Sequence, residues 1–532
     1  MKIEKQNRRE FLQFGAAGVA ALSVMKNVNA KDVFKSDTNE ELIEITVSEL
    51  QAKMSSGDVS AKKLVEKYLE RIKNIDPKLG SVIETNPDAL KIAEDLDRER
   101  KSRRLRGALH GIPILIKDNI DTADKMHTTA GSLALLDAPT PKQDAFIVQQ
   151  LRKSGAVILG KTNLSEWANF RSTKSSSGWS GRGGQTHNPY VLDRNPCGSS
   201  SGTGSAIAAN LAAIGIGTET DGSVICPAAT CGLVGIKPTL GLVSRSGIIP
   251  IAHSQDTAGP MARTVTDAAI LLSVLIGTDK SDAITSQSVK GAKDYTKFLD
   301  ANGLRGMRIG VGRQVFGKNS KIDAVIEPHL EVFKAGGATL VDVEFPTNGK
   351  FGDAEFDVLL YEFKADLNKY LAQRNSPHQT LADLIKFNEE NKDREMPYFG
   401  QEIFTMANKK GDLNERAYRL ALQKSKLLTQ AQGIDAVMNK SKLDAIIAPS
   451  GGAAWMTDLV NGDCGVFEGL TSFAAVAGYP SITVPAGFVQ NLPVGMTFLG
   501  HAFSEPTLIK IAYAFEQATK ARRTPKFLPT YG

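Results

Sequence analysis

Two clusters of small residues carry hydroxyl groups that could act as nucleophiles. The first is Gly-Ser-Ser-Ser-Gly at residues 198–202, and the second is the turn Thr-Asp-Gly-Ser at residues 220–223. Small side chains allow the backbone to approach a ligand closely, and successive backbone amides in such turns can hold an oxyanion. Acyl transfer through a serine needs both a nucleophilic hydroxyl and amides that bind an oxyanion, so this part of the chain indicates hydrolase chemistry.

A serine hydroxyl is a weak nucleophile unless a neighbouring group accepts its proton. No histidine lies beside either serine cluster in the sequence, although folding could bring a distant one close. Lys117 is a second candidate, because it ends the apolar run 112–116 and is followed by Asp118 and Asn119. A lysine at the end of a buried strand also often extends to solvent, so the residue alone leaves both interpretations open.

Other chemistries fit the sequence less well. The spacing of Gly198, Ser200 and Gly202 matches the nucleophile elbow of α/β-hydrolase esterases, but that motif needs a preceding strand, and residues 193–197 do not have a strand pattern. The seven histidines are scattered and no Cys-x-x-Cys pair occurs, so we expect neither a metal nor a cofactor. Ser200 therefore remains an alternative nucleophile to be tested.

Four cysteines are too few for a disulfide scaffold. Cys226 and Cys231 are five residues apart and could form a disulfide in an oxidising compartment, but two buried free thiols fit equally well.

Helix and strand patterns alternate on both sides of the serine clusters, which predicts an α/β fold with a large mixed sheet, helices on both faces and a single domain. Thr46 and Ser60 have the positions of helix N-caps. Further helices are expected at 88–104, 144–154, 206–213, 264–276, 321–335 and 505–521, with four long ones within 355–438, and strands at 112–116, 156–159, 214–217, 307–311, 339–343, 443–448, 481–484 and 496–499.

Composition narrows the class of protein further. Hydrophobic residues make up 42% and charged residues 23% of the 532 residues, which is typical of a soluble globular protein. The net charge of +6 is small for this length, so nucleic acid is not an expected partner.

The first thirty residues have the pattern of an export signal. Arg8 and Arg9 precede an apolar stretch from residue 14 to residue 25, and Ala30 follows. The paired arginines resemble a twin-arginine signal, so we expect residues 1–30 to be recognised by the twin-arginine export machinery and residues 31–532 to form a periplasmic or secreted catalytic domain without a membrane partner. An amphipathic N-terminal helix is the alternative.

The order of these motifs resembles the amidase signature family. The matching segments are residues 111–119 around Lys117, the serine run 198–202, the turn 217–223 and the segment 227–239. The resemblance extends from about residue 40 to the C-terminus. It implies a large mixed sheet sandwiched by helices, and amide hydrolysis through a covalent acyl-enzyme.

The resemblance also assigns roles to individual residues. Ser223 matches the nucleophile, Ser199 the bridging serine whose preceding peptide bond is cis in this family, and Lys117 the terminal base. The backbone amides of Thr220, Asp221, Gly222 and Ser223 match the oxyanion hole. A lysine must be neutral to accept a proton, and burial lowers its pKa.

Two departures from the common family pattern bear on the substrate. Asp221 stands where glycine is usual, and Ile225 and Cys226 occupy positions where many relatives carry an arginine that can hold a substrate carboxylate. Segments 178–186 and 245–256 look closest to the peptide amidase branch, which implies C-terminal peptide amides as substrates. The alternatives are an amidotransferase subunit, which supplies ammonia to a tRNA-dependent partner and which export would disfavour, and a binding protein without catalysis.

Overall fold

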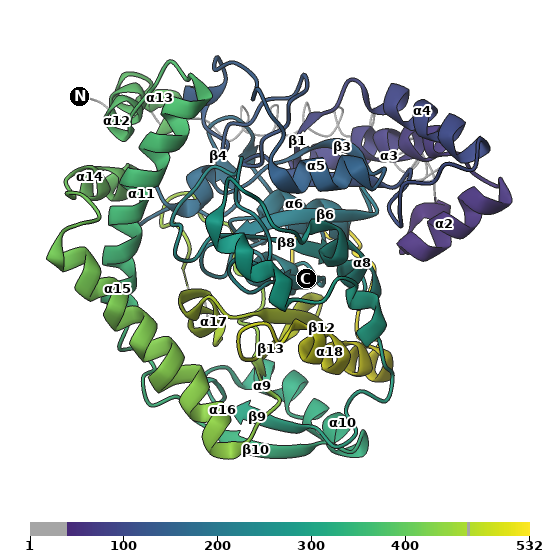
Figure 1. Cartoon of the computed structure of the whole chain (residues 1–532), viewed down its shortest axis with the longest axis vertical. Helices are drawn as coiled ribbons and strands as arrows, with labels where there is room; N and C mark the ends of the chain where they lie inside the picture. Colours follow the sequence, from purple (N-terminus) through teal and green to yellow (C-terminus); the bar gives the residue numbers. More distant parts are fainter. Residues whose placement is uncertain (1–39, 465–468, 532) are drawn as a thin grey trace, which may run out of the picture. The chain divides into compact units, whose positions relative to one another are not determined.

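In the computed structural model, which describes residues 40–464 and 469–531, an 11-stranded sheet organises the chain from Glu44 onward (Figure 1). Parallel pairs such as β2 with β6 occur beside antiparallel pairs such as β6 with β8, which confirms the predicted mixed sheet. The strands follow the order β1 (Val82–Thr85), β3 (Val157–Thr162), β2 (Pro113–Lys117), β6 (Ile214–Glu219), β8 (Thr257–Ala262), β7 (Val234–Lys237), β12 (Ser481–Val489), β13 (Leu492–Leu499), β11 (Ala445–Pro449), β9 (Arg308–Gly312) and β10 (Thr339–Val343).

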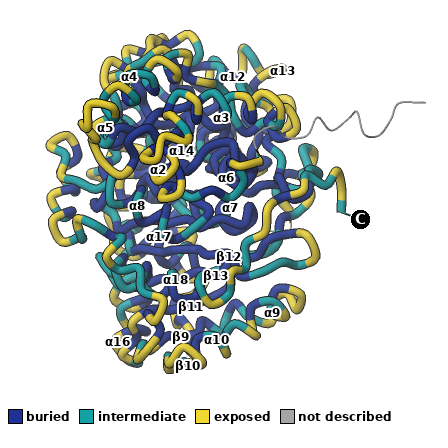
Figure 2. The backbone as a smooth tube through the Cα atoms, turned by 90° about the vertical axis from the view of Figure 1, so that its right-hand side faces the viewer, coloured by how far each residue is buried: buried dark blue, intermediate teal, exposed yellow. Residues whose placement is uncertain are grey.

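Helices cover both faces of the central strands. Every residue of β2, β3, β6, β7 and β8 is buried, although alternate side chains of a strand point to opposite faces. Helices α6 (Ser201–Ala208), α7 (Ile225–Thr230) and α8 (Val265–Leu275) contact these strands, and α8 in turn packs against α5 (Phe146–Lys153) and α18 (Glu505–Thr519). Figure 2 shows the buried strands inside and the exposed residues on the outer helices and loops.

The N-caps predicted from the sequence are confirmed. Thr46 forms a capping box with Glu49 at the start of α2 (Val47–Ser56), and the Ser60 hydroxyl accepts from Lys63 N at the start of α3 (Ala61–Ile75). Helix α4 (Ala89–Lys101) follows. Residues 40–43 contain a short 3-10 turn, Glu40–Leu42, in a unit of their own, and the predicted signal 1–30 lies outside the described residues.

Two helix predictions need correction. The helix expected at 321–335 is two helices, α9 (Ser320–Ile326) and α10 (His329–Ala335), because Pro328 between them has no N–H to continue the first. Where four long helices were expected within 355–438, the structure has six α-helices, of 4 to 23 residues: α11 (Gly352–Arg374), α12 (Leu381–Glu390), α13 (Lys392–Glu395), α14 (Glu402–Asn408), α15 (Arg416–Thr429) and α16 (Asp435–Ser441). Figure 1 shows α15 alongside α11.

The helix expected at 206–213 is α6, which begins earlier, at Ser201 within the Gly/Ser run, and ends earlier, at Ala208. Gly202 explains why small residues occur there: a Cβ at this position would lie 2.4 Å from the carbonyl oxygens of both Ser81 and Asn163. The run therefore brings the start of a helix against neighbouring backbone and is not a flexible loop. Among the described helices, none has both the length and the apolar character needed to cross a bilayer.

Candidate active site

Lys117, Ser199 and Ser223 meet in one continuous hydrogen-bonded chain. Lys117 Nζ donates to Ser199 Oγ at 2.8 Å, and Ser199 Oγ donates to Ser223 Oγ at 2.9 Å. Lys117 and Ser199 are fully buried, whereas Ser223 keeps 8% of its surface exposed. Of the three side chains, Ser223 is thus the one that a substrate can reach.

The fold explains this convergence. Strands β2 and β6 are parallel neighbours, so Lys117 at the end of β2 lies at the same sheet edge as the turn that follows β6. Ser199 lies just before α6, which contacts both strands. The peptide bond between Gly198 and Ser199 is cis, as the family resemblance implied.

The surroundings of Lys117 favour its neutral form. Burial lowers the pKa of Lys117 to about 7, while the carboxylates of Asp256 and Glu219 oppose part of this shift. Besides Ser199, the amine contacts Thr218 Oγ1 at 2.9 Å and the Thr218 carbonyl at 3.3 Å. In the neutral amine, the two N–H groups can donate to the Thr218 oxygens and the lone pair faces Ser199. The hydroxyl directions then reverse, so that Ser199 donates to Lys117 and accepts from Ser223.

Thr218 and Asn119 were not identified as site residues from the sequence. Asn119 Nδ2 donates to Thr218 Oγ1 at 3.0 Å, which fixes the hydroxyl that contacts Lys117. Asn119 follows Lys117 closely in the chain, but only the pairing of β2 with β6 brings Thr218 to it.

The turn at residues 220–223 is held by the residue before it. Glu219 Oε2 accepts from the backbone amides of Val224 at 2.8 Å and Ile225 at 3.0 Å, and Cys226 N donates to the Gly222 carbonyl at 2.8 Å. Gly222 has a φ of +75°, a conformation that favours glycine. Within residues 40–464 and 469–531, we find no protein acceptor for the N–H groups of Gly222 and Ser223. These amides can therefore bind an anionic oxygen.

Ser200 does not have the geometry of a nucleophile elbow. Its hydroxyl donates to the Thr218 carbonyl at 3.1 Å and accepts from Thr218 N at 3.2 Å. The residues immediately before it form no strand, and the side chain is fully buried. These contacts tie the start of α6 to β6.

The suggested pairing of Cys226 with Cys231 is wrong, because Cys226 forms a disulfide with Cys197. Helix α7 explains the difference: five positions along a helix rotate a side chain by about 140°. Cys231 instead has a buried free thiol that lies 3.8 Å from the Pro196 carbonyl. The disulfide thus links the segment before Ser199 to the helix after Ser223.

Removing this disulfide is expected to destabilise the protein. The double substitution Cys197→Ala and Cys226→Ala should lower the free energy of unfolding by about 2–4 kcal/mol, because the bridge closes a loop with a sequence separation of 29 and so restricts the unfolded chain. Urea unfolding measures the difference. The control Cys464→Ala, at an exposed free cysteine, should change stability by less than about 0.5 kcal/mol. Equal stability of both variants would contradict the prediction.

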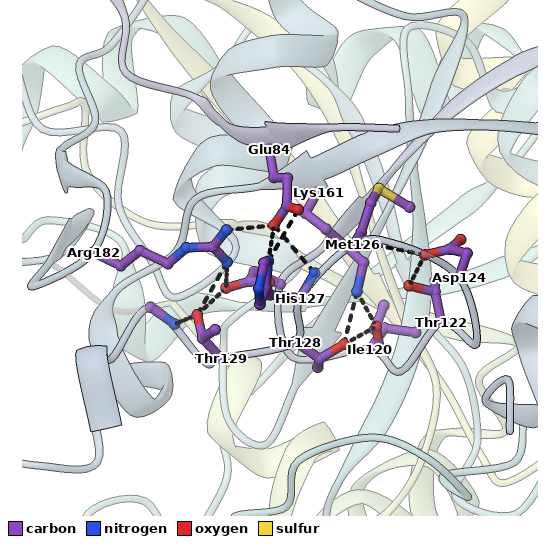
Figure 3. Close-up of polar contacts among 12 residues, drawn as sticks. Glu84, Ile120, Thr122, Asp124, Met126, His127, Thr128, Thr129, Lys161 and Arg182 are labelled. Carbon is purple, nitrogen blue, oxygen red and sulfur yellow. Dashed lines mark hydrogen bonds and ion pairs between the residues drawn. The ribbon is translucent and has the colours of Figure 1, made fainter. Parts of the chain in front are cut away.

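A second group of polar residues holds the loop that follows Lys117 (Figure 3). Lys161, at the end of β3, donates to the Ile120 carbonyl at 2.6 Å and to Thr128 Oγ1 at 2.9 Å, and burial lowers its pKa. Arg182 pairs with Glu84 and also with Asp118, at 3.3 Å. These contacts fix both ends of the segment 118–129, which carries Asn119, so we assign them a structural role.

A cavity of about 570 Å³ adjoins the site and is lined on one side by Asn119, Thr218 and Thr220. Several charged side chains on its walls are paired, including Arg374 with Asp121 at 2.8 Å. His253, Glu362 and Asp366 place possible ligand atoms within 4.8 Å of one another. The histidine bonds to Asp366 at 2.7 Å, while Glu362 accepts from Ser254 N and from Tyr418 OH. These hydrogen bonds explain why the three side chains lie close together.

Known proteins resemble this chain over the whole part that contains the site. The model of the amidase family matches residues 63–509. A probable amidase of Arabidopsis thaliana is 43% identical over 498 residues, or 91% of this chain and 92% of that protein. A native peptide amidase from Stenotrophomonas maltophilia is 51% identical with a TM-score of 0.87, covering 91% of this chain and 99% of that chain. One subunit of the glutamyl-tRNA(Gln) amidotransferase of Thermoanaerobacter pseudethanolicus is 34% identical over 504 residues, or 91% of this chain and 99% of that protein.

Proposed function

The chain belongs to the amidase family and is an amide-hydrolysing enzyme, and on that premise we propose that it removes the C-terminal amide of peptides. The observation that carries this proposal is the 51% identity with a peptide amidase over nearly the full length of both chains. The products would be a peptide with a free carboxylate and ammonia.

In the proposed mechanism, Ser223 Oγ attacks the carbonyl carbon of the amide. Its proton passes to Ser199 Oγ, and the Ser199 proton passes to the neutral amine of Lys117. The amides of the turn 220–223 stabilise the oxyanion. When the tetrahedral intermediate collapses, Lys117 returns a proton through Ser199 to the departing nitrogen, and ammonia leaves. Water, deprotonated by the same relay, then hydrolyses the acyl-enzyme.

Residues beside the nucleophile support a substrate without a free carboxylate near the scissile bond. Ile225 is apolar, and the sulfur of Cys226 is bonded to Cys197. Neither side chain carries a positive charge, so neither can bind a substrate carboxylate as an arginine would. A peptide amide has no charge at its C-terminal end and fits this environment.

The test is a comparison of substrates at equal enzyme concentration, with ammonia release as the readout. Amidated dipeptides and tripeptides should be hydrolysed with higher kcat/KM than simple aliphatic primary amides or amides that carry a free carboxylate. A preference for simple amides would contradict the proposed substrate class.

An amidotransferase function is the second candidate, because the chain is also 34% identical to a glutamyl-tRNA(Gln) amidotransferase subunit. That function would use glutamine as the amide donor and would require a partner that binds tRNA. Glutamine carries a free carboxylate besides its amide. Residues 225 and 226 offer no positive charge to bind that carboxylate, which disfavours the amidotransferase function. Efficient release of ammonia from free glutamine would favour this alternative.

We also propose that the enzyme is exported through the twin-arginine route and acts in the periplasm or outside the cell, on the basis of Arg8, Arg9 and the following apolar stretch. Replacing both arginines by lysine is expected to retain the protein in the cytoplasm while leaving the charge unchanged. Cell fractionation followed by immunoblotting measures this, and Lys2→Arg serves as the control. Unchanged export of the double variant would contradict the twin-arginine assignment.

A further inference from the structure

Thr220, the first residue of the turn that leads to Ser223, is held at its hydroxyl and at its backbone carbonyl by two consecutive residues. Its hydroxyl donates to Asp256 Oδ1 at 2.6 Å, and its backbone carbonyl accepts from Gln255 Nε2 at 3.2 Å. Neither Gln255 nor Asp256 has a hydrogen bond to Lys117, Ser199 or Ser223 among the described contacts. The influence of Gln255 on the site is therefore transmitted through Thr220, whereas the charge of Asp256 also raises the pKa of Lys117.

The pairing of β6 with β8 brings these residues together. Glu219 at the end of β6 lies opposite Thr257 at the start of β8 in an antiparallel register, so the residues before Thr257 lie beside those after Glu219. Asp256 Oδ2 also accepts from the amides of Ile251 at 2.8 Å and Ala252 at 2.9 Å, which fix the carboxylate before it meets Thr220.

Gln255 is fixed in the same way. It is 2% exposed, and its amide nitrogen also donates to Glu355 Oε1 at 3.0 Å on helix α11. One N–H of the side-chain amide is thus held by α11, while the other points to the Thr220 carbonyl. A buried amide with both N–H groups in use has little freedom to turn.

The orientation of the Thr220 carbonyl determines the orientation of the next backbone amide. In a trans peptide, the C=O of one residue and the N–H of the next point in opposite directions in one plane. A carbonyl directed at Gln255 therefore directs the N–H of Asp221 away from Gln255. Asp221 N–H belongs to the amides of the turn 220–223 proposed above to bind the oxyanion.

We propose that Gln255 is a positioning residue that aims the amide of Asp221 into the oxyanion hole, with Asp256 holding the side chain of the same residue, Thr220. This inference rests on the proposed role of the turn 220–223. Gln255 makes no contact with the reacting atoms, so its loss should weaken transition-state stabilisation more than substrate binding.

Gln255→Leu tests the proposal, since leucine has a similar size and no N–H to donate. We expect kcat for an amidated dipeptide to fall about 10- to 100-fold with KM changed less than about 3-fold, since losing an oxyanion donor outright costs about 10²- to 10³-fold. Affinity for a peptide boronic acid, which forms a tetrahedral adduct on a serine, should fall in parallel with kcat/KM. If Gln255 had a purely structural role, the change in boronate affinity would not follow the change in kcat/KM.

Gln430→Leu is the matched control, because Gln430 Nε2 donates to the Ala477 carbonyl at 2.7 Å, outside the turn.

Thr220→Val is the second variant: it removes the bond to Asp256 and keeps the carbonyl bonded to Gln255, so its kcat should fall less than that of Gln255→Leu. The proposal is overturned if Gln255→Leu folds and retains kcat, or if it loses kcat no more than either of the other two variants. If Gln255→Leu does not fold, Gln255→Met, which also lacks an N–H to donate, is measured in its place. A parallel fall in kcat and boronate affinity then supports the proposal, and wild-type kcat overturns it. Retained activity in Ser223→Ala would instead overturn the proposed mechanism itself.

Discussion

Replacing Ser223 by alanine is expected to lower kcat for an amide substrate by about 10⁵- to 10⁶-fold, the range found when the nucleophile of a serine hydrolase is removed. The substitution deletes the one atom that forms the covalent bond, whereas the amides of the turn remain. Residual rate above the uncatalysed reaction would come from those amides and from binding. Ammonia release at high enzyme concentration measures the loss.

Ser200→Ala is the matched control for this experiment. Both serines lie in the buried segments around the site, but among the described residues the Ser200 hydroxyl bonds only to the backbone of Thr218. Its removal is expected to change kcat less than about 10-fold. Treatment of the wild type with a fluorophosphonate should label Ser223, as read by peptide mass spectrometry. A label on Ser200 with Ser223 unmodified would contradict the assignment and favour the esterase-type alternative.

The chemistry of the site was open to prediction from the sequence because its parts have distinctive types. A lysine after an apolar run, a Gly/Ser run and a Thr-Asp-Gly-Ser turn are unusual together, and the resemblance to a family gave them an order. The structure places Lys117 Nζ 2.8 Å from Ser199 Oγ, and Ser199 Oγ 2.9 Å from Ser223 Oγ. Their catalytic roles stay predictions until the substitutions are made.

The residues that support the site could not be found in the same way. Thr218, Gln255 and Asp256 acquire their partners only through the register of β6 with its neighbours β2 and β8. A glutamine and an aspartate before a strand have many possible structural roles, and nothing in their spacing indicates contact with Thr220. Supporting contacts of this kind depend on tertiary structure, which local patterns do not specify.

The fold was predictable where strands are apolar runs and not where they contain small residues. Strand β2 was expected from residues 112–116, whereas β7 and β8 were not expected, because Gly and Pro interrupt their apolar pattern. Gly259 in β8 shows the cause: a Cβ there would lie 2.0 Å from the Ile236 carbonyl oxygen of β7. Close contact between backbones selects glycine, which removes the signal that identifies a strand.

Removing Lys117 is expected to have the second-largest effect. Lys117→Ala should lower kcat for amides by about 10³- to 10⁴-fold, because the relay loses its terminal proton acceptor. Activated esters, whose leaving group needs no proton, should lose less. Adding Ser199→Ala to Lys117→Ala should cause little further loss for amides, since both residues act in the same relay. Additive losses in the double variant would contradict a single relay.

The same residue should set the pH dependence of the reaction. Burial lowers the pKa of Lys117 to about 7, and only the neutral amine accepts a proton. Below pH 7 the amine is protonated, so kcat/KM should fall about tenfold per pH unit as the pH decreases, and above pH 7 it should reach a plateau. The residual activity of Lys117→Ala should lack this decrease below pH 7, the acidic limb of the pH profile.

Lys161→Met is the matched control for the pH profile. Lys161 is also fully buried, at the end of the neighbouring parallel strand β3, but its amine contacts Ile120 and Thr128 instead of a serine of the relay. The variant is expected to lower stability and to leave the midpoint of the limb near pH 7. If the midpoint moves with Lys161 and stays in Lys117→Ala, the base of the reaction is not Lys117. Because kcat/KM reports ionisations of the free enzyme, the measured midpoint can be compared directly with the titration of Lys117 in the absence of substrate.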